Sequence, residues 1–299
     1  MNNFKYHLYK MYSNNNEIFN KLSDLYKNIL NRSIDHDGYL KYQNMSLEQA
    51  ETNMLNSVEK KYLKLSQLLT PYEIGLDKQR IGDKHDGGYV IFPELISKID
   101  RCYTYGVGND YSFETELVKL YPYKICHMYD HTVSYPETVS HNIFFKKEGL
   151  MLLPMDDGNT FENHLIQNND QNKKILLKID IEGAEWSIFL NIDDKLFDNV
   201  VVMVVEFHWL CRHNQLPLYE SVFEKINKYF TLCHIHANNC GYVVNLENNK
   251  LFPGVVEATY VNNKYIDDKK IRDTPYPSHL DSPNDQHKPD IILNYWLRN

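Results

Sequence analysis

The strongest constraint on the fold is a series of short apolar runs that begins after residue 80 and alternates with stretches of helical character. Each run has the length of a strand, and the runs cover residues 102–106, 124–129, 143–147, 175–181, 200–208, 231–237 and 255–261. Five of them are separated by helical or loop segments, which favours a parallel sheet with helices on both faces. A polar, hairpin-like stretch from Asn238 to Gly254 joins the last two and predicts an antiparallel pair at the sheet edge. We therefore predict an α/β fold with a mostly parallel sheet.

The first 70 residues show a helical pattern instead. Ser46 and Gln49 have the spacing of a capping box, in which each side chain bonds the backbone N–H of the other. Apolar residues at steps of three and four then predict one helix that Thr70-Pro71 ends: Leu47, Ala50, Met54, Val58, Tyr62, Leu65 and Leu69. An earlier helix is predicted through Ile18, Leu22, Leu25, Tyr26 and Ile29. We expect a helical extension over residues 1–70 and a second domain over residues 71–299.

The role of this extension is open between three hypotheses. We favour helices that pack on the main domain. A homo-oligomerisation arm and a lid over the substrate are the alternatives.

The net charge and the cysteines indicate which binding partners and which cellular compartment to expect. The 299 residues carry a formal net charge of -8. A sequence-independent nucleic-acid binder needs a basic face, so nucleic acid is disfavoured as a partner. The five cysteines are scattered and lie mostly in apolar runs, which favours reduced thiols. No run approaches the about 20 apolar residues of a membrane span, and Met1–Tyr6 lacks a secretory signal, so we expect a cytoplasmic protein.

The stretch from Cys102 to Asp110 predicts a nucleoside site. A strand that ends in Gly106-Val-Gly108 lets the backbone approach a ligand closely, and the next strand ends in Asp130, which can accept from ribose hydroxyls. Tyr111 stands where a dinucleotide fingerprint has its third glycine, which favours S-adenosylmethionine over NAD. Asp156, before the next helix, is our choice for a hydrogen bond to the adenine amine. The alternative to a nucleoside site is a tight turn with Asp130 as a surface aspartate. The alternative for Asp156, and for Asp157 beside it, is a helix-capping carboxylate.

A second group of polar residues follows two later strands. Asp180 and Glu182 come at the carboxyl end of the run 175–181, where ligands gather in open α/β sheets. Glu206 and His208 end the run 200–208, and their period-two spacing places them on one side. We predict that all four meet at one rim, with His208, Asp180 and Glu206 catalytic and Glu182 in contact with substrate.

The chemistry of this rim has two interpretations. Asp180 and Glu206 can hold a divalent cation such as Mg²⁺, which lowers the pKa of a bound hydroxyl while His208 takes its proton. Alternatively, Glu182 and Glu185 are exposed charges of a first helical turn and His208 is a hydrogen-bonded loop residue.

Several ordered segments resemble the FkbM-type methyltransferases over about residues 78–262. They are Lys178-Ile-Asp180-Ile-Glu182-Gly183-Ala-Glu185, Arg80-Ile-Gly82, Asp86-Gly87-Gly88-Tyr89-Val90, Tyr105–Glu114 and Glu206-Phe-His208. The resemblance implies a Rossmann-like class I fold, S-adenosylmethionine as cofactor, and O-methylation of a sugar or another small hydroxylated metabolite. It also implies that Gly106, Gly108 and Asp130 contact the cofactor, with Arg80 and Glu114 near its amino-acid end or the acceptor.

Three other polar segments are weaker candidates. The amides of Asn238 and Asn239 can pair with sugar hydroxyls as donors and acceptors. His234-x-His236 has the same-face spacing of a metal pair, although hydrogen-bonded histidines are commoner. The late loop from His279 to Asn284 is either a cover over the acceptor or a surface turn.

We therefore expect an S-adenosylmethionine-dependent O-methyltransferase that acts on a hydroxyl of a sugar or glycan. One alternative is methylation of a protein or nucleic acid, although the chain lacks the Asn-Pro-Pro-Tyr-type motif of amino-group nucleic-acid methyltransferases. Another is a non-catalytic nucleoside-binding scaffold whose N-terminal helices recruit a partner.

Overall fold

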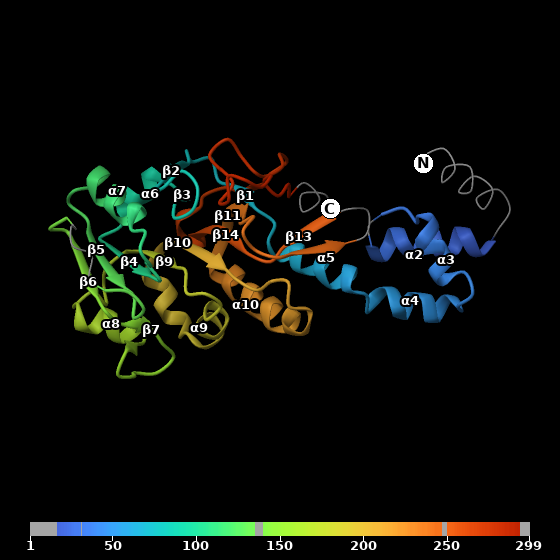
Figure 1. Ribbon diagram of the computed structural model, residues 1–299, viewed down its shortest axis with the longest axis horizontal. Coiled ribbons are helices and arrows are strands. Elements are labelled where there is room, and N and C mark those ends of the chain that lie inside the picture. Colours follow the sequence, from blue (N-terminus) through green and yellow to red (C-terminus); the bar gives the residue numbers. More distant parts are fainter. Residues whose placement is uncertain (1–16, 31, 135–139, 247–249, 294–299) are drawn as a thin grey trace. The chain divides into compact units, whose positions relative to one another are not determined.

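A computed structural model describes residues 17–30, 32–134, 140–246 and 250–293 (Figure 1). The chain divides into two compact units, one up to Gln67 and one from Leu68 to Arg298. Met1–Tyr6, which entered the prediction of the compartment, lies outside the described residues. Among those described, no helix has the length and apolarity that a membrane crossing requires.

The first unit is helical, with α2 (Glu17–Leu30), α3 (His36–Tyr42), α4 (Leu47–Leu55) and most of α5 (Val58–Leu68). Its core gathers apolar side chains from α2, α3, α4 and the segment between α2 and α3: Phe19, Leu22, Tyr26, Ile29, Leu30, Ile34, Tyr39, Tyr42, Ala50 and Met54. Ser46 and Gln49 form the predicted capping box. Self-association through these helices stays a prediction.

The single long helix predicted from Leu47 to Leu69 is wrong. It is broken between α4 and α5, where Asn56 caps the end of α4 and the Ser57 hydroxyl accepts from the backbone N–H of Lys60. Leu47 and Val58, which were expected on the apolar face, are exposed. A serine that can cap a new helix interrupts the apolar periodicity without a glycine or proline to announce it.

The second unit is built on a seven-stranded sheet with the order β11-β14-β10-β9-β4-β5-β6. Its strands are β4 (Arg101–Tyr105), β5 (Ile125–Tyr129), β6 (Ile143–Lys146), β9 (Ile175–Ile179), β10 (Val200–Phe207), β11 (Phe230–Ala237) and β14 (Val256–Asn262). From β6 to β10 all neighbours are parallel, whereas β14 is antiparallel to both β10 and β11. The predicted α/β fold is confirmed, and so is the antiparallel pair at the edge.

The tertiary structure adds one feature to that edge pair, because β14 lies between β10 and β11. The chain leaves β11 through a small hairpin of β12 (Val243–Leu246) and β13 (Lys250–Pro253) and returns as β14. Short pairs also form between β1 (Tyr72–Glu73) and β15 (Lys270–Ile271), between β2 (Gln79–Ile81) and β3 (Tyr89–Ile91), and between β7 (Gly149–Leu150) and β8 (Gly158–Asn159).

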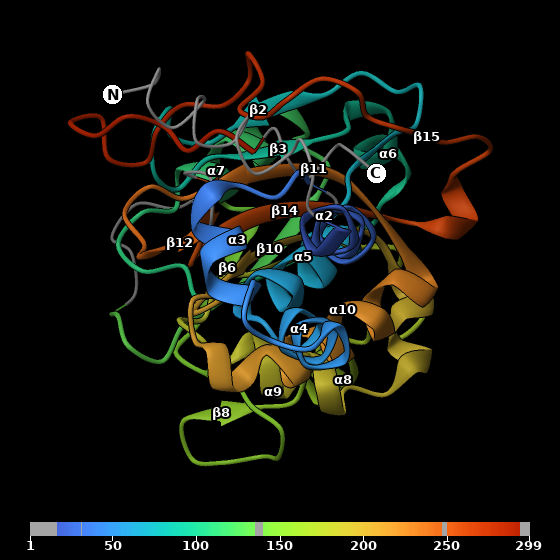
Figure 2. The same ribbon diagram turned by 90° about the vertical axis from the view of Figure 1, so that its right-hand side faces the viewer.

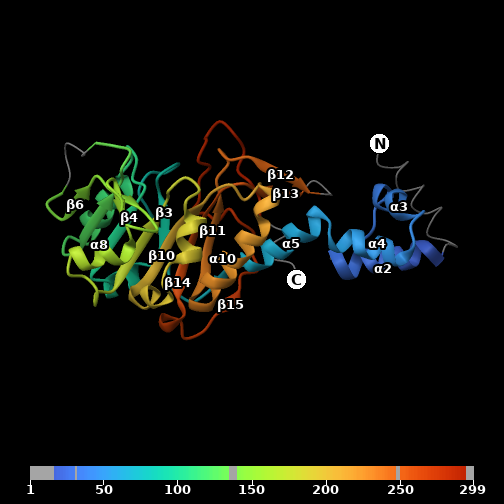
Figure 3. The ribbon, with the colours of Figure 1, turned by 90° about the horizontal axis from the view of Figure 1, so that it is seen from below.

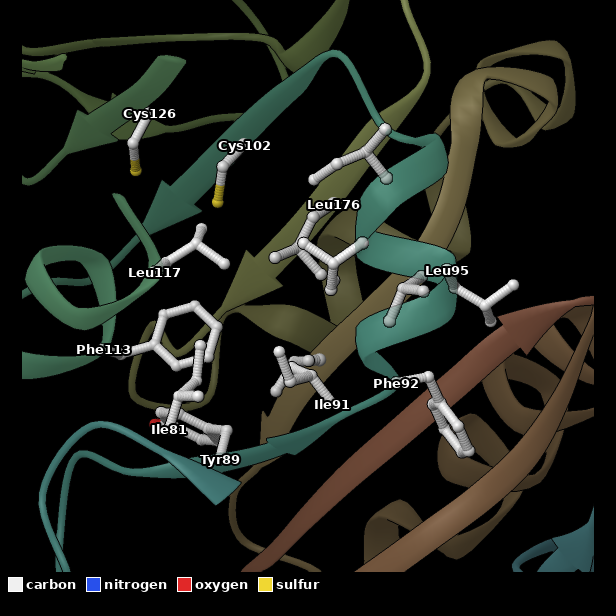
Figure 4. Close-up of a cluster of buried hydrophobic side chains, with 14 of the residues drawn as sticks. Ile81, Tyr89, Ile91, Phe92, Leu95, Cys102, Phe113, Leu117, Cys126 and Leu176 are labelled. Atoms are coloured by element: carbon white, nitrogen blue, oxygen red, sulfur yellow. The ribbon is translucent and has the colours of Figure 1, made fainter. Parts of the chain in front are cut away.

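Helices cover both faces of the sheet. On one face lie α8 (Phe161–Gln167), α9 (Glu185–Asn191) and α10 (Leu216–Tyr229), as Figures 2 and 3 show. On the other face lie α6 (Pro93–Lys98) and α7 (Ser112–Leu120) with the β2–β3 pair. Figure 4 shows the core beneath them, where Ile91, Leu95, Phe113, Leu117 and Leu176 pack together. Burial on both faces explains why a central strand such as β10 is a continuous apolar run rather than an alternating one.

Candidate active site

A cavity of about 850 Å³ lies at the carboxyl ends of the central strands. It spans the point between β4 and β9 where the strand order reverses, which is the usual ligand site of an open α/β sheet. The glycine end of the cavity is lined by residues 106–110, 129–132 and 149–151. The carboxylate end lies toward β10 and is lined by Asp86, Asp180, Glu182, Glu206, His208, Trp209, Asn238 and Tyr242.

Gly106 joins the two ends by backbone contact. Its φ is +74°, and a Cβ there would lie 1.5 Å from the carbonyl oxygen of Asp180. The Asp180 N–H also donates to the Tyr105 carbonyl at 3.0 Å. Any side chain at position 106 would therefore push the loops after β4 and β9 apart.

Asp130 is the fixed carboxylate of the glycine end. It accepts from the N–H of Gly108 at 2.8 Å, and from the N–H and hydroxyl of Thr132 at 2.7 and 2.6 Å. Burial raises the pKa of Asp130, but these hydrogen bonds outweigh it and hold the pKa below its usual value. Asp130 is therefore an oriented, ionised acceptor on the wall of the cavity.

Asp180 and His208 face each other at the carboxylate end. The Tyr89 hydroxyl donates to Asp180 Oδ2 at 3.0 Å, and His208 Nε2 lies 3.9 Å from Asp180 Oδ1. Burial raises the pKa of Tyr89 well above its usual value, and the charges of Asp180 and Glu206 raise it further. Tyr89 therefore stays a neutral donor that orients Asp180.

His208 is held from behind by Glu185, the first residue of α9. His208 Nδ1 lies 2.7 Å from Glu185 Oε1, and Glu185 is fully buried. Burial by itself lowers the pKa of His208, but the hydrogen bond and charge of Glu185, with the charges of Asp180 and Glu182, raise it overall. A carboxylate on Nδ1 fixes the tautomer of a neutral imidazole, so Nε2 is the nitrogen turned toward the cavity.

Glu206 lies deeper, at only 5% exposure. Its Oε1 accepts from the Asn238 amide at 2.7 Å, and its register partner on β14 is another acid, Glu257. Burial, followed by the charges of Asp180 and Glu257, raises the pKa of Glu206 well above its usual value. Glu206 therefore binds a proton more readily than an ordinary carboxylate does.

Comparison with known proteins decides the family. The family model for the methyltransferase FkbM domain matches residues 59–244, which is more than half of the chain. The chain belongs to the FkbM methyltransferase family. Its predicted family and enzyme class are thereby confirmed.

Two further comparisons add little to this methyltransferase assignment. One solved structure that matches is a Clostridium thermocellum protein with the provisional description of an rRNA-methylase. It has 10% identity and a TM-score of 0.32, and the match covers 56% of this chain and 91% of that chain. No curated protein matches the sequence significantly.

The methyltransferase has one group of side chains with the spacing of metal ligands, within the part of the chain that the structure describes. One ligand atom from each of Asp180, Glu182 and His208 lies within 4.8 Å of the others. The predicted pair was Asp180 and Glu206, but Glu206 is outside this group. A mixed carboxylate and imidazole set suits Mn²⁺ or Zn²⁺ better than Mg²⁺, which prefers oxygen ligands.

Four predicted site residues of the methyltransferase do not line the cavity. Glu114 is fully buried behind the wall, 3.6 Å from Nζ of Lys178, which does line it. Arg80 donates to the carbonyls of His85 and Asp83 and shapes the loop that carries Asp86. The other two are Asp156, exposed in the turn between β7 and β8, and Asn239, whose amide donates to the carbonyls of residues 285, 288 and 289.

The two histidines of β11 are engaged by acids rather than free for a metal. His234 Nε2 lies 2.8 Å from Asp281, and His236 lies between Glu257 at 3.2 Å and Asp290 at 3.1 Å. The late loop is anchored on β11 through Asp281, and on β14 through Asn284, whose amide donates to Glu257 at 2.6 Å. It does not line the cavity, although the Asn284 amide reaches Asp86, which does.

Sequence reasoning overlooked three contributors to this site: Glu185, Tyr89 and Trp209. Glu185 is the last residue of the family signature, and that position was a usable signal, but we assigned it no role at the site and named it only in the alternative interpretation, as an exposed helix charge. Tyr89 lies 91 positions from its partner Asp180, so no local pattern joins them. Trp209 has a φ of +65°. The sequence does not reveal that this residue adopts a left-handed backbone conformation.

Proposed function

We propose that this methyltransferase uses S-adenosylmethionine and transfers the methyl group to a hydroxyl of a sugar. The observation that carries the proposal is the continuity of the cavity from Asp130 to His208. A nucleoside held at the glycine end lies beside groups that can accept a proton. Backbone contact between Gly106 and Asp180 fixes the spacing of the two ends.

At the glycine end, Asp130 would accept hydrogen bonds from the ribose hydroxyls of the cofactor. The cofactor supplies a methyl group on a sulfonium, which is already activated for displacement. The protein therefore has to align the hydroxyl oxygen with the methyl carbon and to remove the hydroxyl proton.

His208 is our candidate for the group that removes this proton, at Nε2. Glu185 on Nδ1 orients the ring and stabilises the cation that forms. Only the neutral ring can act as a base. Because the pKa of His208 is raised, we expect turnover to increase with pH beyond the usual range of an imidazole.

A divalent cation is the competing way to activate the hydroxyl. Asp180, Glu182 and His208 would hold it, and it would lower the pKa of a bound hydroxyl. Nε2 of His208 cannot bind a metal and accept a proton at the same time. The two hypotheses therefore exclude each other and can be separated by experiment.

The lining of the carboxylate end supports a sugar acceptor. Asn238 and Asp180 can hydrogen-bond hydroxyls, and the rings of Trp209 and Tyr242 offer flat apolar surface. A nucleic-acid acceptor is disfavoured, because its phosphates would approach several carboxylates.

The test is methyl transfer from labelled cofactor to a panel of sugars, read by mass spectrometry over a pH series. We expect His208→Ala to lower turnover by about 100- to 10,000-fold and to leave cofactor affinity within about threefold. We expect Glu185→Gln to move the rising limb of the pH profile to lower pH, because a charge that raises the pKa of His208 is lost.

Three outcomes would count against parts of the proposal. Equal loss of cofactor affinity in His208→Ala would reject His208 as the base. Activity that excess chelator abolishes and Mn²⁺ or Mg²⁺ restores would favour the metal hypothesis. Failure of the wild-type protein to bind S-adenosylmethionine would reject the cofactor assignment.

A further inference from the structure

More acids than cations line the carboxylate end. The four acids are Asp86, Asp180, Glu182 and Glu206, of which Asp86 and Glu182 are exposed to solvent and Glu206 is the most deeply buried. Among the residues that the structure describes, the cavity wall contains one lysine, Lys178, and no arginine.

The positive charge of Lys178 is already paired with another acid, Glu114. Its side chain is buried, and Nζ lies 3.6 Å from Glu114, whose carboxylate is also buried and has no hydrogen-bond partner. A buried carboxylate needs a nearby cation to remain ionised. His208 is paired in the same way, because its Nδ1 lies 2.7 Å from Oε1 of Glu185.

The hydrogen-bond donors to the lining acids are mostly neutral. Asp180 accepts from the Tyr89 hydroxyl, Glu206 from the Asn238 amide, and Asp86 from the Asn284 amide at 3.1 Å. Neutral donors orient a carboxylate without cancelling its charge. S-adenosylmethionine adds one net positive charge, from a sulfonium and an ammonium against one carboxylate, so an excess of acid remains when the cofactor is bound.

The lining of the carboxylate end is unsuited to binding a phosphate group. Phosphate groups are recognised by arginine, lysine or clustered backbone N–H groups, and the carboxylate end offers acids instead. It does offer the rings of Trp209 and Tyr242, the latter 77% exposed. Aromatic faces attract both the C–H surface of sugars and the charge of an ammonium group.

We propose that the acceptor carries a protonated amine beside its hydroxyl groups and carries no phosphate, an amino sugar being the simplest type. The ammonium group lies against Glu206 and Asp180, the two acids of this end that are not exposed and that accept hydrogen bonds only from neutral donors. A nucleotide-linked or phosphorylated sugar is excluded by repulsion. This inference rests on the proposed function, since it assigns the acceptor of the same cavity.

Binding to the full-length protein saturated with S-adenosylhomocysteine tests the inference, at pH 7, low salt and with chelator present. The probes are methyl glycosides of glucosamine, galactosamine and mannosamine, their neutral hydroxyl counterparts, and the 6-phosphates of the neutral sugars. Calorimetry or ligand-observed NMR measures the dissociation constants. We expect the aminated probes to bind at least about tenfold more tightly than the neutral ones, and the phosphates not to bind.

Variants sharpen this test. We expect Glu206→Gln to reduce the preference for the amine to less than about threefold. The matched control is Asp156→Asn, an exposed acid outside the cavity, which should leave the preference unchanged. Affinity for S-adenosylhomocysteine in each variant reports whether the glycine end is intact.

Equal binding of aminated and neutral probes, tighter binding of the phosphates, or no binding of any probe would overturn the inference. Absence of S-adenosylhomocysteine binding in the wild-type protein would instead contradict the proposed function. An amine preference that survives in Glu206→Gln would overturn the placement of the ammonium group.

Discussion

The two ends of the cavity differ in the kinds of residue that line them. The glycine end contains Gly106, Gly108 and Gly149, and its carboxylate Asp130 is fixed by three hydrogen bonds. The carboxylate end consists of side chains from four different segments, and its acids range from exposed, at Asp86 and Glu182, to buried, at Glu206.

Under the proposed function, the difference matches what each end would recognise. A cofactor that never varies can be held by a rigid backbone loop whose conformation follows from local sequence. An acceptor that differs among enzymes of one fold is recognised by side chains, which change without disturbing the sheet. The carboxylate end accordingly depends on long-range support, from Tyr89, Glu185 and the late loop anchored to β11 and β14.

The largest effect is expected where the two ends touch. Gly106→Ala would place a methyl group against the Asp180 carbonyl and would strain a backbone at φ +74°. We expect methyl transfer to fall by at least about a hundredfold, since separation of the loops misaligns both reactants.

Gly75→Ala is the matched control. Gly75 also has a positive φ, +73°, but a Cβ there meets no atom within 4 Å, and Gly75 does not line the cavity. It should show only the cost of the left-handed conformation, about 1–2 kcal/mol. Equal activity of the two alanine variants would show that the loops after β4 and β9 are not in contact.

The next-largest effect is expected at His236 of β11, where protonation of the side chain stabilises the fold. Burial lowers the pKa of His236, but its hydrogen bonds to Asp290 and Glu257 outweigh burial and raise the pKa to about 10. Because the folded value exceeds the unfolded value, this protonation stabilises the fold fully below about pH 6.5. The stabilisation is then lost as the pH rises toward 10.

We therefore expect His236→Gln to lower the free energy of unfolding by about 3–5 kcal/mol near pH 6, measured by urea denaturation. The difference from wild type should shrink as the pH approaches 10, and a constant difference would contradict the assignment. Asp198→Asn, at an exposed ion pair with Lys264, is the control and should change stability by less than about 1 kcal/mol.

A smaller effect is expected at the glycine end. Asp130→Asn removes the charge that would accept the ribose hydroxyls and places an amide group near the N–H of Gly108. Cofactor affinity should fall by about 10- to 100-fold, measured by calorimetry. Binding of the acceptor at the other end should change less than about threefold, and a larger change there would show that the ends are coupled.

The smallest effect is expected at Asp156. The sequence suggested it as the adenine partner, but it is exposed and does not line the cavity. Asp156→Ala should change cofactor affinity and turnover by less than about twofold. A loss of tenfold or more in affinity would restore the original assignment.

Much of the sheet was predictable because its signals are local. The run of β10 is apolar throughout, since both faces of the strand are covered, and its limits were predicted to within a residue. The break after Asn56 was missed because the apolar spacing continues across it, and only the capping geometry ends the helix there.

The sequence by itself determined which strand ends carry glycines and acids, because strand length, alternation and tight turns depend on neighbouring residues. Only the tertiary structure decided which of these side chains meet. The contacts of Tyr89 with Asp180, of Asn284 with Asp86 and of Lys178 with Glu114 join residues 64 to 198 positions apart. Such contacts follow from how the whole sheet packs, and no local pattern of residue types encodes them.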